Sequence, residues 1–159
     1  MAEGGVRRFT DLADRLPELL QELRNAPAQR RGVGDKVAAV PGIYLLTEKG
    51  KPIYVGQTRN LRRRLGEHGR ASAQENQASF AFNIARAEAR ESSHINLAQS
   101  RKSLEADPAF APLFSRARQR VSAMEIRVIR LEDPELRTVF EVYAAVAFGT
   151  EMYNTFETH

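Results

Sequence analysis

Two short apolar runs, each carrying a tyrosine, constrain the fold more than any other feature of the sequence. They occupy residues 43–46 (IYLL) and 53–56 (IYVG), and both are rich in residues that favour strands. Gly50 and Pro52 lie between the runs and mark a turn. The sequence therefore predicts a β-hairpin over this segment.

The hairpin carries Tyr44 in its first strand and Tyr54 in its second. If the loop holds three or five residues, the register places the two tyrosines directly opposite each other on one face, with Cβ atoms about 5 Å apart. Two phenols would then share a surface. Paired tyrosines are also ordinary constituents of sheets, so the pair by itself leaves a purely structural role open.

An arginine-rich segment follows the hairpin. Leu61 and Leu65 give it the apolar edge of a helix, which Thr58 or Asn60 can cap. Between residues 59 and 70 there are five arginines and one acidic residue, a local charge of +4 that suits a polyanionic partner. The alternative interpretation is a solvated helix face.

The arginines of this helix divide by direction. At about 100° per residue, Arg64 and His68 border the apolar edge, so we expect both to lie over the sheet. Arg62 and Arg63 point toward solvent or toward a phosphate backbone. The structural alternatives are a pairing of Arg64 with Glu67 or a nearby acid, and a satisfied boundary position for His68.

The C-terminal part of the chain predicts a third strand and a last helix. Residues 123–131 alternate apolar and charged side chains, as strands with two different faces do. Asp133 and Pro134 are typical of a helix start, and the helix is expected to run to about Phe148 and stop at Gly149.

Glu141 lies in an apolar setting within this last helix. It is the only charged residue from 139 to 148. A carboxylate in such a place is exposed, paired or bound to a cation, because burying it alone is costly. Arg137, one turn earlier, offers an ion pair, and binding of a cation is the equal alternative.

The other segments predict helices around this framework. Residues 9–24 predict an amphipathic helix, broken near Pro17, and residues 25–37 predict a linker. Residues 71–120 are mostly helical in pattern, with Phe80, Ile84 and Ala87 on one face and breaks at Pro108 and Pro112.

Composition limits the cellular compartment in which the protein is expected and the kinds of site that it can form. The 159 residues include no cysteine, which excludes disulfides, thiolate zinc sites and a cysteine nucleophile. No apolar run approaches the roughly 20 residues that span a bilayer, and the N-terminal segment lacks the apolar core of a secretory signal. We therefore expect a cytoplasmic protein with no membrane partner. Basic residues exceed acidic ones by four (24 against 20), and the abundant arginine suits phosphate recognition.

Taken together, these residues resemble the GIY-YIG endonuclease superfamily. The resemblance rests on Gly42-Ile43-Tyr44, on Tyr54-Val55-Gly56 after a short turn, and on Arg64, Glu141 and Asn154 in that order. It implies an α+β fold in which a small three-stranded antiparallel sheet is flanked by helices. It also implies cleavage of nucleic-acid phosphodiester bonds with one divalent cation held chiefly by a glutamate.

The resemblance assigns roles to individual residues. Arg64 becomes a phosphate clamp, Glu141 the metal ligand and Asn154 a support for the site. His68 is similar to a histidine of restriction enzymes in this superfamily, and Gln57 stands where repair members often carry lysine. The implied catalytic residues are Tyr44, Tyr54, Arg64, His68, Glu141 and Asn154, and the candidate substrate contacts are Gln57, Arg59, Arg62 and Arg63.

Phosphodiester hydrolysis needs an activated water, neutralised phosphoryl oxygens and a stabilised leaving oxygen. Tyr44 is our candidate general base, and we expect the nearby Arg64 cation to favour its phenolate. Tyr54 would orient or relay a proton, and His68 could relay the proton or contact phosphate. Mg²⁺ (or Mn²⁺) on Glu141 would acidify the water.

The predicted organisation is an N-terminal helix and linker at residues 1–36 and a nuclease domain at 37–159, with a helical insertion at about 71–120. The leading hypothesis is a metal-dependent DNA endonuclease of restriction, phage defence, mobile elements or repair. The alternative is a non-catalytic nucleic-acid-binding or protein-interaction module on the same scaffold. Residues 9–24 leave room for a homodimer or a protein partner. Further candidate DNA contacts are Arg86, Arg90, Arg101 and Lys102.

Overall fold

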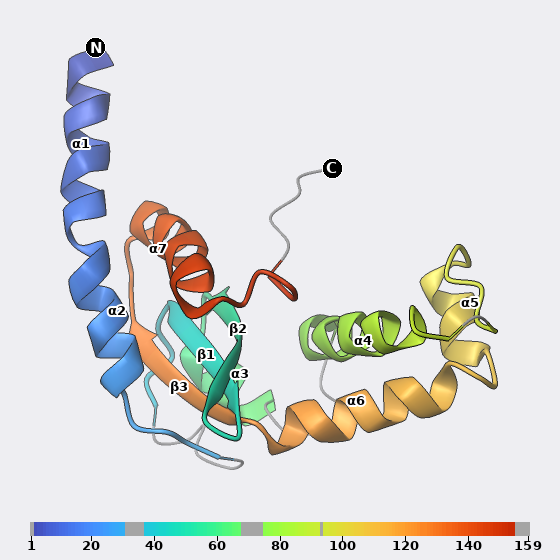
Figure 1. The fold of residues 1–159 in the computed structure, drawn as a ribbon. Coiled ribbons are helices and arrows are strands. Elements are labelled where there is room, and N and C mark those ends of the chain that lie inside the picture. Colours follow the sequence, from blue (N-terminus) through green and yellow to red (C-terminus); the bar gives the residue numbers. More distant parts are fainter. Residues whose placement is uncertain (1, 31–36, 68–74, 93, 155–159) are drawn as a thin grey trace.

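The computed structural model describes residues 2–30, 37–67, 75–92 and 94–154. It has the α+β architecture predicted from the sequence, a three-stranded antiparallel sheet flanked by helices (Figure 1). The elements are α1 (Ala2–Asp14), α2 (Leu16–Asn25), β1 (Gly42–Glu48), β2 (Lys51–Thr58), α3 (Leu61–Glu67), α4 (Glu75–Ala89), α5 (Arg101–Ala106), α6 (Ala111–Ala123), β3 (Glu125–Arg130) and α7 (Pro134–Phe148).

The hairpin turn is shorter than predicted. Lys49 and Gly50 alone connect β1 and β2, and both have positive φ angles, 51° and 78°. Glycine adopts such angles at little cost, which accounts for Gly50. The expectation of a turn that includes Pro52 is therefore wrong, since Pro52 pairs with Thr47 in the ladder.

A β-bulge sets the relation between the two tyrosines. The ladder shifts register between Leu46 and Thr47, where Ile53 is the extra residue on β2. Without this shift, the two-residue turn would place Tyr44 and Tyr54 on opposite faces, because paired residues share a face. With it, Tyr44 pairs with Gly56, and Tyr54 pairs with Leu46. The tyrosines thus share a face, as expected, but are offset by two positions, because the turn holds two residues and not the three or five that direct opposition requires.

The sheet order is β2-β1-β3, which places β1 in the centre and β2 at an edge. The predicted third strand at residues 123–131 is confirmed as β3 (Glu125–Arg130). It runs antiparallel to β1, with Val128 opposite Tyr44. On its outer side, Gln29 forms an isolated bridge with Ile126.

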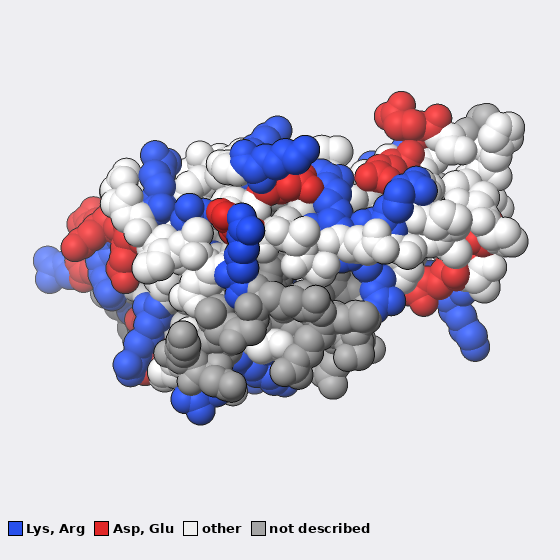
Figure 2. All heavy atoms as spheres, turned by 90° about the horizontal axis from the view of Figure 1, so that it is seen from below, with Lys and Arg blue, Asp and Glu red and all other residues white. Residues whose placement is uncertain are grey.

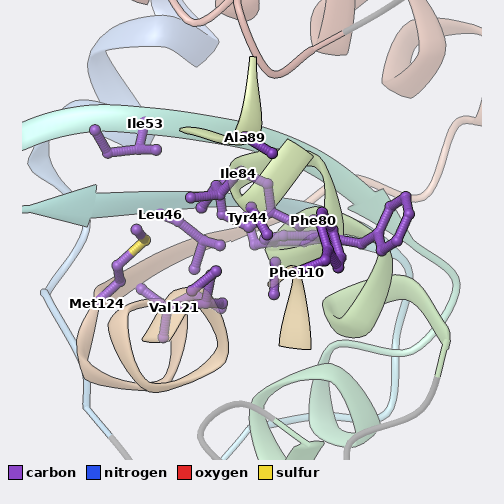
Figure 3. Packing of buried hydrophobic residues seen from close by; sticks show 14 of the residues in the cluster. Tyr44, Leu46, Ile53, Phe80, Ile84, Ala89, Phe110, Val121 and Met124 are labelled. Atoms are coloured by element: carbon purple, nitrogen blue, oxygen red, sulfur yellow. The ribbon is translucent and has the colours of Figure 1, made fainter. Parts of the chain in front are cut away.

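Helices cover both faces of the sheet (Figure 1). On one face, α2 and α7 pack against apolar side chains of all three strands, including Ile43, Val55 and Ile129. On the other face, α4 and α6 bury a second cluster, which includes Tyr44 and Leu46 of the sheet and Phe80, Ile84 and Val121 of the helices (Figure 3). The site described below lies at the edge of the sheet that β2 forms.

Several helix boundaries follow the sequence signals. The break predicted near Pro17 is confirmed between α1 and α2, and Pro17 occupies the first turn of α2. Asp133 caps α7 through bonds from the N–H groups of Glu135 and Leu136, and Gly149 ends it with a left-handed φ of 69°. The predicted break at Pro112 is wrong, because a proline is tolerated in the first turn of a helix, where Pro112 lies in α6.

The N-terminal segment contributes to the core. Leu16, Leu19, Leu20 and Leu23 of α2 are buried against the sheet and α7. By contrast, α1 projects from the body (Figure 1), with Val6 and Phe9 exposed. The division at residues 36 and 37 stays a prediction. No helix among the described residues is long and apolar enough to cross a bilayer.

Candidate active site

Two motif glycines make room for close packing at the site. A Cβ atom on Gly56 would lie 2.3 Å from the hydroxyl oxygen of Tyr44, far inside van der Waals contact. A Cβ atom on Gly42 would lie 2.3 Å from the carbonyl oxygen of Ile129 and 2.7 Å from a methyl carbon of Leu61. In the sequence these glycines were recognised only as part of a motif. The structure shows that a larger residue at either position would clash with its neighbours.

Tyr44 and Arg64 form a buried contact. The Arg64 Nη2 donates a hydrogen bond of 2.6 Å to the Tyr44 hydroxyl, and the guanidinium carbon lies 4.4 Å from the centre of the same ring. Arg64 is 6% exposed. The helix that carries it is anchored by buried Leu61 and Leu65, as predicted, and Asn60 caps its first turn.

The charge of Arg64 is incompletely satisfied. Its Nε atom is buried without a hydrogen-bond partner. Within the described ranges, no carboxylate forms an ion pair with Arg64. The side chain of Glu67, the partner considered for Arg64 in the sequence, lies outside the part of the chain that is described.

Tyr54 is held between aromatic rings. Its ring centre lies 6.1 Å from that of Tyr44, and Phe80 of α4 stacks on its other side at 4.6 Å. Tyr153 meets Phe80 edge-on at 5.6 Å. The sequence predicted Phe80 on a buried helix face without linking it to the site. A pattern within one helix carries no information about the strand residue it will contact.

Burial controls the ionisation of both phenols. Desolvation raises the pKa of Tyr44 above its ordinary 10.0, although Arg64 opposes the rise. The pKa of Tyr54 is raised for the same reason, and the Glu141 carboxylate adds to it. Arg64 favours the phenolate, as expected, but burial outweighs this effect and the net pKa of Tyr44 is raised in the free protein.

Glu141 reaches the site from α7. Its Oε2 accepts a 2.7 Å hydrogen bond from Gln57 Nε2, and Gln57 Oε1 accepts a 3.2 Å bond from Arg137 Nε. The ion pair considered between Arg137 and Glu141 does not form, because the Gln57 amide connects the two charges. Partial burial raises the pKa of Glu141 above 4.5, while Gln57 and Arg137 lower it.

Asn154 supports the edge of the sheet. Its side-chain amide donates to the Val55 carbonyl at 2.6 Å and accepts from the Val55 N–H at 3.0 Å. Thr150 donates a further bond of 2.8 Å to Asn154 Oδ1. These bonds hold β2 next to Tyr54 and anchor the segment after α7.

The remaining candidates lie around this centre. Arg59, Arg62 and Arg63 are exposed, and the Arg62 Nε donates to the Val37 carbonyl at 2.8 Å. His68 lies outside the described residues. In the helical insertion, Arg86, Arg90, Arg101 and Lys102 are all exposed, and Arg101 forms an ion pair with Glu105.

The site's donor set fits a hydrated divalent cation better than a metal enclosed by protein ligands. Among the described residues, no group of three or more His, Cys, Asp and Glu side chains could hold a metal. Glu141 offers a single half-buried carboxylate beside two phenols. Mg²⁺ is commonly bound through one or two carboxylates and keeps several waters.

Comparison with known families agrees with this site. Residues 40–106 match the family model described as the GIY-YIG catalytic domain. The matched segment includes the hairpin with Tyr44 and Tyr54 and the helix with Arg64. Residues 40–106 are therefore similar to a GIY-YIG catalytic domain, and the resemblance found in the sequence is confirmed over this segment.

Two solved structures are also similar to the chain, both of the GIY-YIG N-terminal endonuclease domain of UvrC from Thermotoga maritima. Each is a Tyr-to-Phe point mutant bound to its catalytic divalent cation. The identities are 14% and 17% and the TM-scores 0.41 and 0.37, over 87% of this chain and 96% of each UvrC chain. No curated protein sequence matches the chain.

Proposed function

We propose that this protein is a divalent-metal-dependent endonuclease that hydrolyses phosphodiester bonds of DNA. The observation that carries the proposal is the buried Arg64 guanidinium beside the Tyr44 hydroxyl, with one nitrogen left without a partner. A buried cation in this state favours an incoming anion, and a guanidinium suits phosphate in particular. Arg64 would hold the scissile phosphate next to both phenols.

Tyr44 would act as the general base and take a proton from the attacking water. Because burial raises its pKa, Tyr44 is a neutral phenol in the free protein at pH 7. Only the phenolate fraction could accept the proton, so the cleavage rate should rise with pH through the range above neutrality. Tyr54, on the same face, would orient the water or relay the proton.

Glu141 would hold the cation, for which Mg²⁺ or Mn²⁺ is the expected occupant. When bound, such a cation polarises phosphoryl oxygens and lowers the pKa of its water. Asn154 would keep β2, and with it Tyr54, in place through its two bonds to Val55. His68 remains a proposed participant on the basis of its position after Arg64.

Contacts along the DNA would come from exposed arginines near the site, namely Arg59, Arg62 and Arg63. Figure 2 shows one face of the molecule, on which basic side chains occur at several places with acidic ones between them. Arg59, Arg62 and Arg63 would each make a separate phosphate contact, since arginine suits phosphate. Replacing any one of these arginines with alanine should weaken DNA binding and reduce the dependence of that binding on salt.

Incubation of the purified protein with supercoiled plasmid tests the proposal. We expect nicking or linearisation with Mg²⁺, and no cleavage with EDTA or in a Glu141→Ala variant. Each chain has one candidate site, so linear product requires two subunits or two visits. Binding without cleavage, across several metals and branched or single-stranded substrates, would contradict the proposal and favour the non-catalytic module.

The same assay assigns the base. We expect Tyr44→Phe to abolish cleavage and its rise with pH, while Tyr54→Phe retains a weaker activity with the same pH dependence. Normal cleavage by Tyr44→Phe together with an inactive Tyr54→Phe would reverse the two roles.

A further inference from the structure

Gln57 and Arg137 form a hydrogen-bonded chain that ends at Glu141. Gln57 pairs with Ile43, so it lies on the sheet face opposite the two phenols. Arg137 is 7% exposed, although it is an arginine on a helix that packs against β2. Besides Gln57, it donates from Nη1 to the carbonyl of Leu131 at 3.0 Å and to that of Glu132 at 3.2 Å. Its guanidinium is thus fixed by the turn between β3 and α7.

Resting on the proposed function, we propose that Arg137 and Gln57 are positioning residues that orient the Glu141 carboxylate for binding the divalent cation. The sequence suggested Gln57 as a substrate contact. Its side-chain hydrogen bonds instead join two protein side chains, with 2.7 Å to Glu141 and 3.2 Å to Arg137. Gln57 therefore acts within the protein, through Glu141.

The chemistry of the three groups fixes the direction of the Gln57 amide. A guanidinium has only donors, so it requires the amide oxygen of Gln57 on its side. The amide NH₂ must then point the other way, toward Glu141, which as a carboxylate has only acceptors. A flipped amide would face donor with donor and acceptor with acceptor. The buried, immobile Arg137 thereby selects one orientation of an exposed glutamine.

This arrangement restricts Glu141 without using up its capacity as a ligand. A glutamate side chain has several rotatable bonds and loses conformational freedom when it binds an ion. The bond from Gln57 to Oε2 restricts the Glu141 side chain before the cation binds, so less conformational freedom is lost on binding. The carboxylate has two oxygens and can still coordinate the cation. In metal sites, removal of a group that orients a ligand typically lowers metal affinity by about 10- to 100-fold.

Arg137 also has a structural role, so the test needs a variant that leaves that role intact. Gln57→Met keeps the length of an exposed side chain and removes both of its bonds. It leaves the bonds from Arg137 to Leu131 and Glu132 in place, so we expect the fold to be retained with only a small decrease in the melting temperature, because Arg137 and Glu141 each lose one partner. Arg137→Met removes the source of orientation. Arg130→Met serves as its control, since Arg130 is an exposed arginine paired with Glu132.

The first measurement is the NMR spectrum of the side-chain NH₂ group of Gln57, assigned by its loss in Gln57→Met. We expect the two NH₂ protons to have shifts unlike those of a solvated glutamine. In folded Arg137→Met they should move to the solvated values, and in Arg130→Met they should stay. Unchanged signals in Arg137→Met, or solvated values in the wild type, would overturn the proposal without bearing on nuclease activity.

The second measurement is Mn²⁺ affinity without DNA, from the electron paramagnetic resonance of free Mn²⁺. We expect about 10- to 100-fold weaker binding in Gln57→Met and Arg137→Met, and wild-type binding in Arg130→Met. Wild-type affinity in Gln57→Met would overturn the proposal. Binding that is unaffected by Glu141→Ala would instead remove the metal role of Glu141 from the proposed function, while the NMR result would still decide whether Arg137 orients Gln57.

Discussion

Gly56 is a residue whose side chain is excluded by another residue of the site. The Tyr44 hydroxyl lies 2.3 Å from the place of a Cβ atom on Gly56. Tyr44 is also bonded to Arg64 and packed in the core, so its ring has little space to move. The pairing of a small and a large residue across β1 and β2 therefore determines where the phenol lies.

We predict that Gly56→Ala displaces the Tyr44 ring and lowers the free energy of unfolding by ~1–3 kcal/mol, as overpacking of a core does. Gly66→Ala is the control, because a Cβ atom there has no neighbour within 4 Å. That variant should be neutral or slightly more stable, since alanine favours a helix over glycine. Urea unfolding measures both, and equal stability of the two variants would contradict the steric argument.

A second prediction for a single residue concerns how Glu141 makes the stability of the fold depend on pH. Because burial raises its pKa above 4.5 in the folded protein, the folded state binds this proton more tightly than the unfolded state does. The ionised group therefore destabilises the fold at neutral pH, and the penalty disappears as the pH falls through its pKa. Glu141→Gln should melt at a higher temperature than the wild type at pH 7, with the difference shrinking toward pH 4.

The control for this prediction is Glu151→Gln, because Glu151 is an exposed glutamate in the last described turn. We expect it to leave the melting temperature nearly unchanged throughout the pH range. A Glu141→Gln difference that stays constant with pH would show that ionisation of Glu141 is not its cause.

Individual site residues were partly predictable. The helical angle of Arg64 relative to Leu61 and Leu65 predicted its burial over the sheet, because helix geometry is local. The pKa of Tyr44 was not predictable, since desolvation depends on how α4 and α6 close over it. The partners of Gln57 were likewise not predictable, because its side-chain hydrogen bonds reach residues of α7 that are about 80 positions away in the chain.

At the scale of elements, α4 links the helical region after α3 to the candidate site. Phe80 is 3% exposed and stacks on Tyr54 at a ring distance of 4.6 Å. Figure 3 shows Phe80 beside Tyr44 in the same cluster. Helix α4 thus packs against the second phenol, Tyr54, through Phe80.

We predict that Phe80→Leu keeps the fold but reduces plasmid nicking by about tenfold or more, since the stacking that fixes the Tyr54 ring is lost. Phe114→Leu is the matched control, because its ring pairs with Phe82 and Phe110 instead. Both variants should lose a similar ~1 kcal/mol of stability. Equal nicking rates in the two would contradict the role of Phe80.

The elements themselves were predictable where the signal is local. Asp133 and Gly149 marked the ends of α7, and Pro17 marked the break before α2. The hairpin register was not predictable, because the bulge at Ile53 depends on the pairing of two strands. The bulge is visible in the ladder itself, where Leu46 pairs with Tyr54 and Thr47 pairs with Pro52.

For the whole molecule, the packing of α2 against the sheet and α7 contributes to stability. Leu23 of α2 is fully buried, at 0% exposure, in the cluster that α2 forms with the sheet and α7. It precedes residues 40–106, the segment that matches the family model. The amphipathic pattern of residues 9–24 predicted a buried face. It could not specify the partner of that face, because the contacts with β3 and α7 are over a hundred residues away.

We predict that Leu23→Ala lowers the free energy of unfolding by ~2–5 kcal/mol, the usual cost of a cavity in a core. Phe9→Ala should cost less than about 0.5 kcal/mol, because Phe9 is 56% exposed on α1. Urea unfolding of both variants measures the difference. A small effect of Leu23→Ala would mean that α2 is an appendage of the nuclease fold.

The bonds from Asn154 to Val55 also have a consequence for self-association. The N–H and C=O groups of an edge strand can recruit a strand from another molecule, which is a common start of aggregation. Asn154 satisfies both groups of Val55 with one side-chain amide and so takes the place of a neighbouring strand at that point. The residue that supports the site thus also protects this point of the β2 edge against pairing with other copies of the chain.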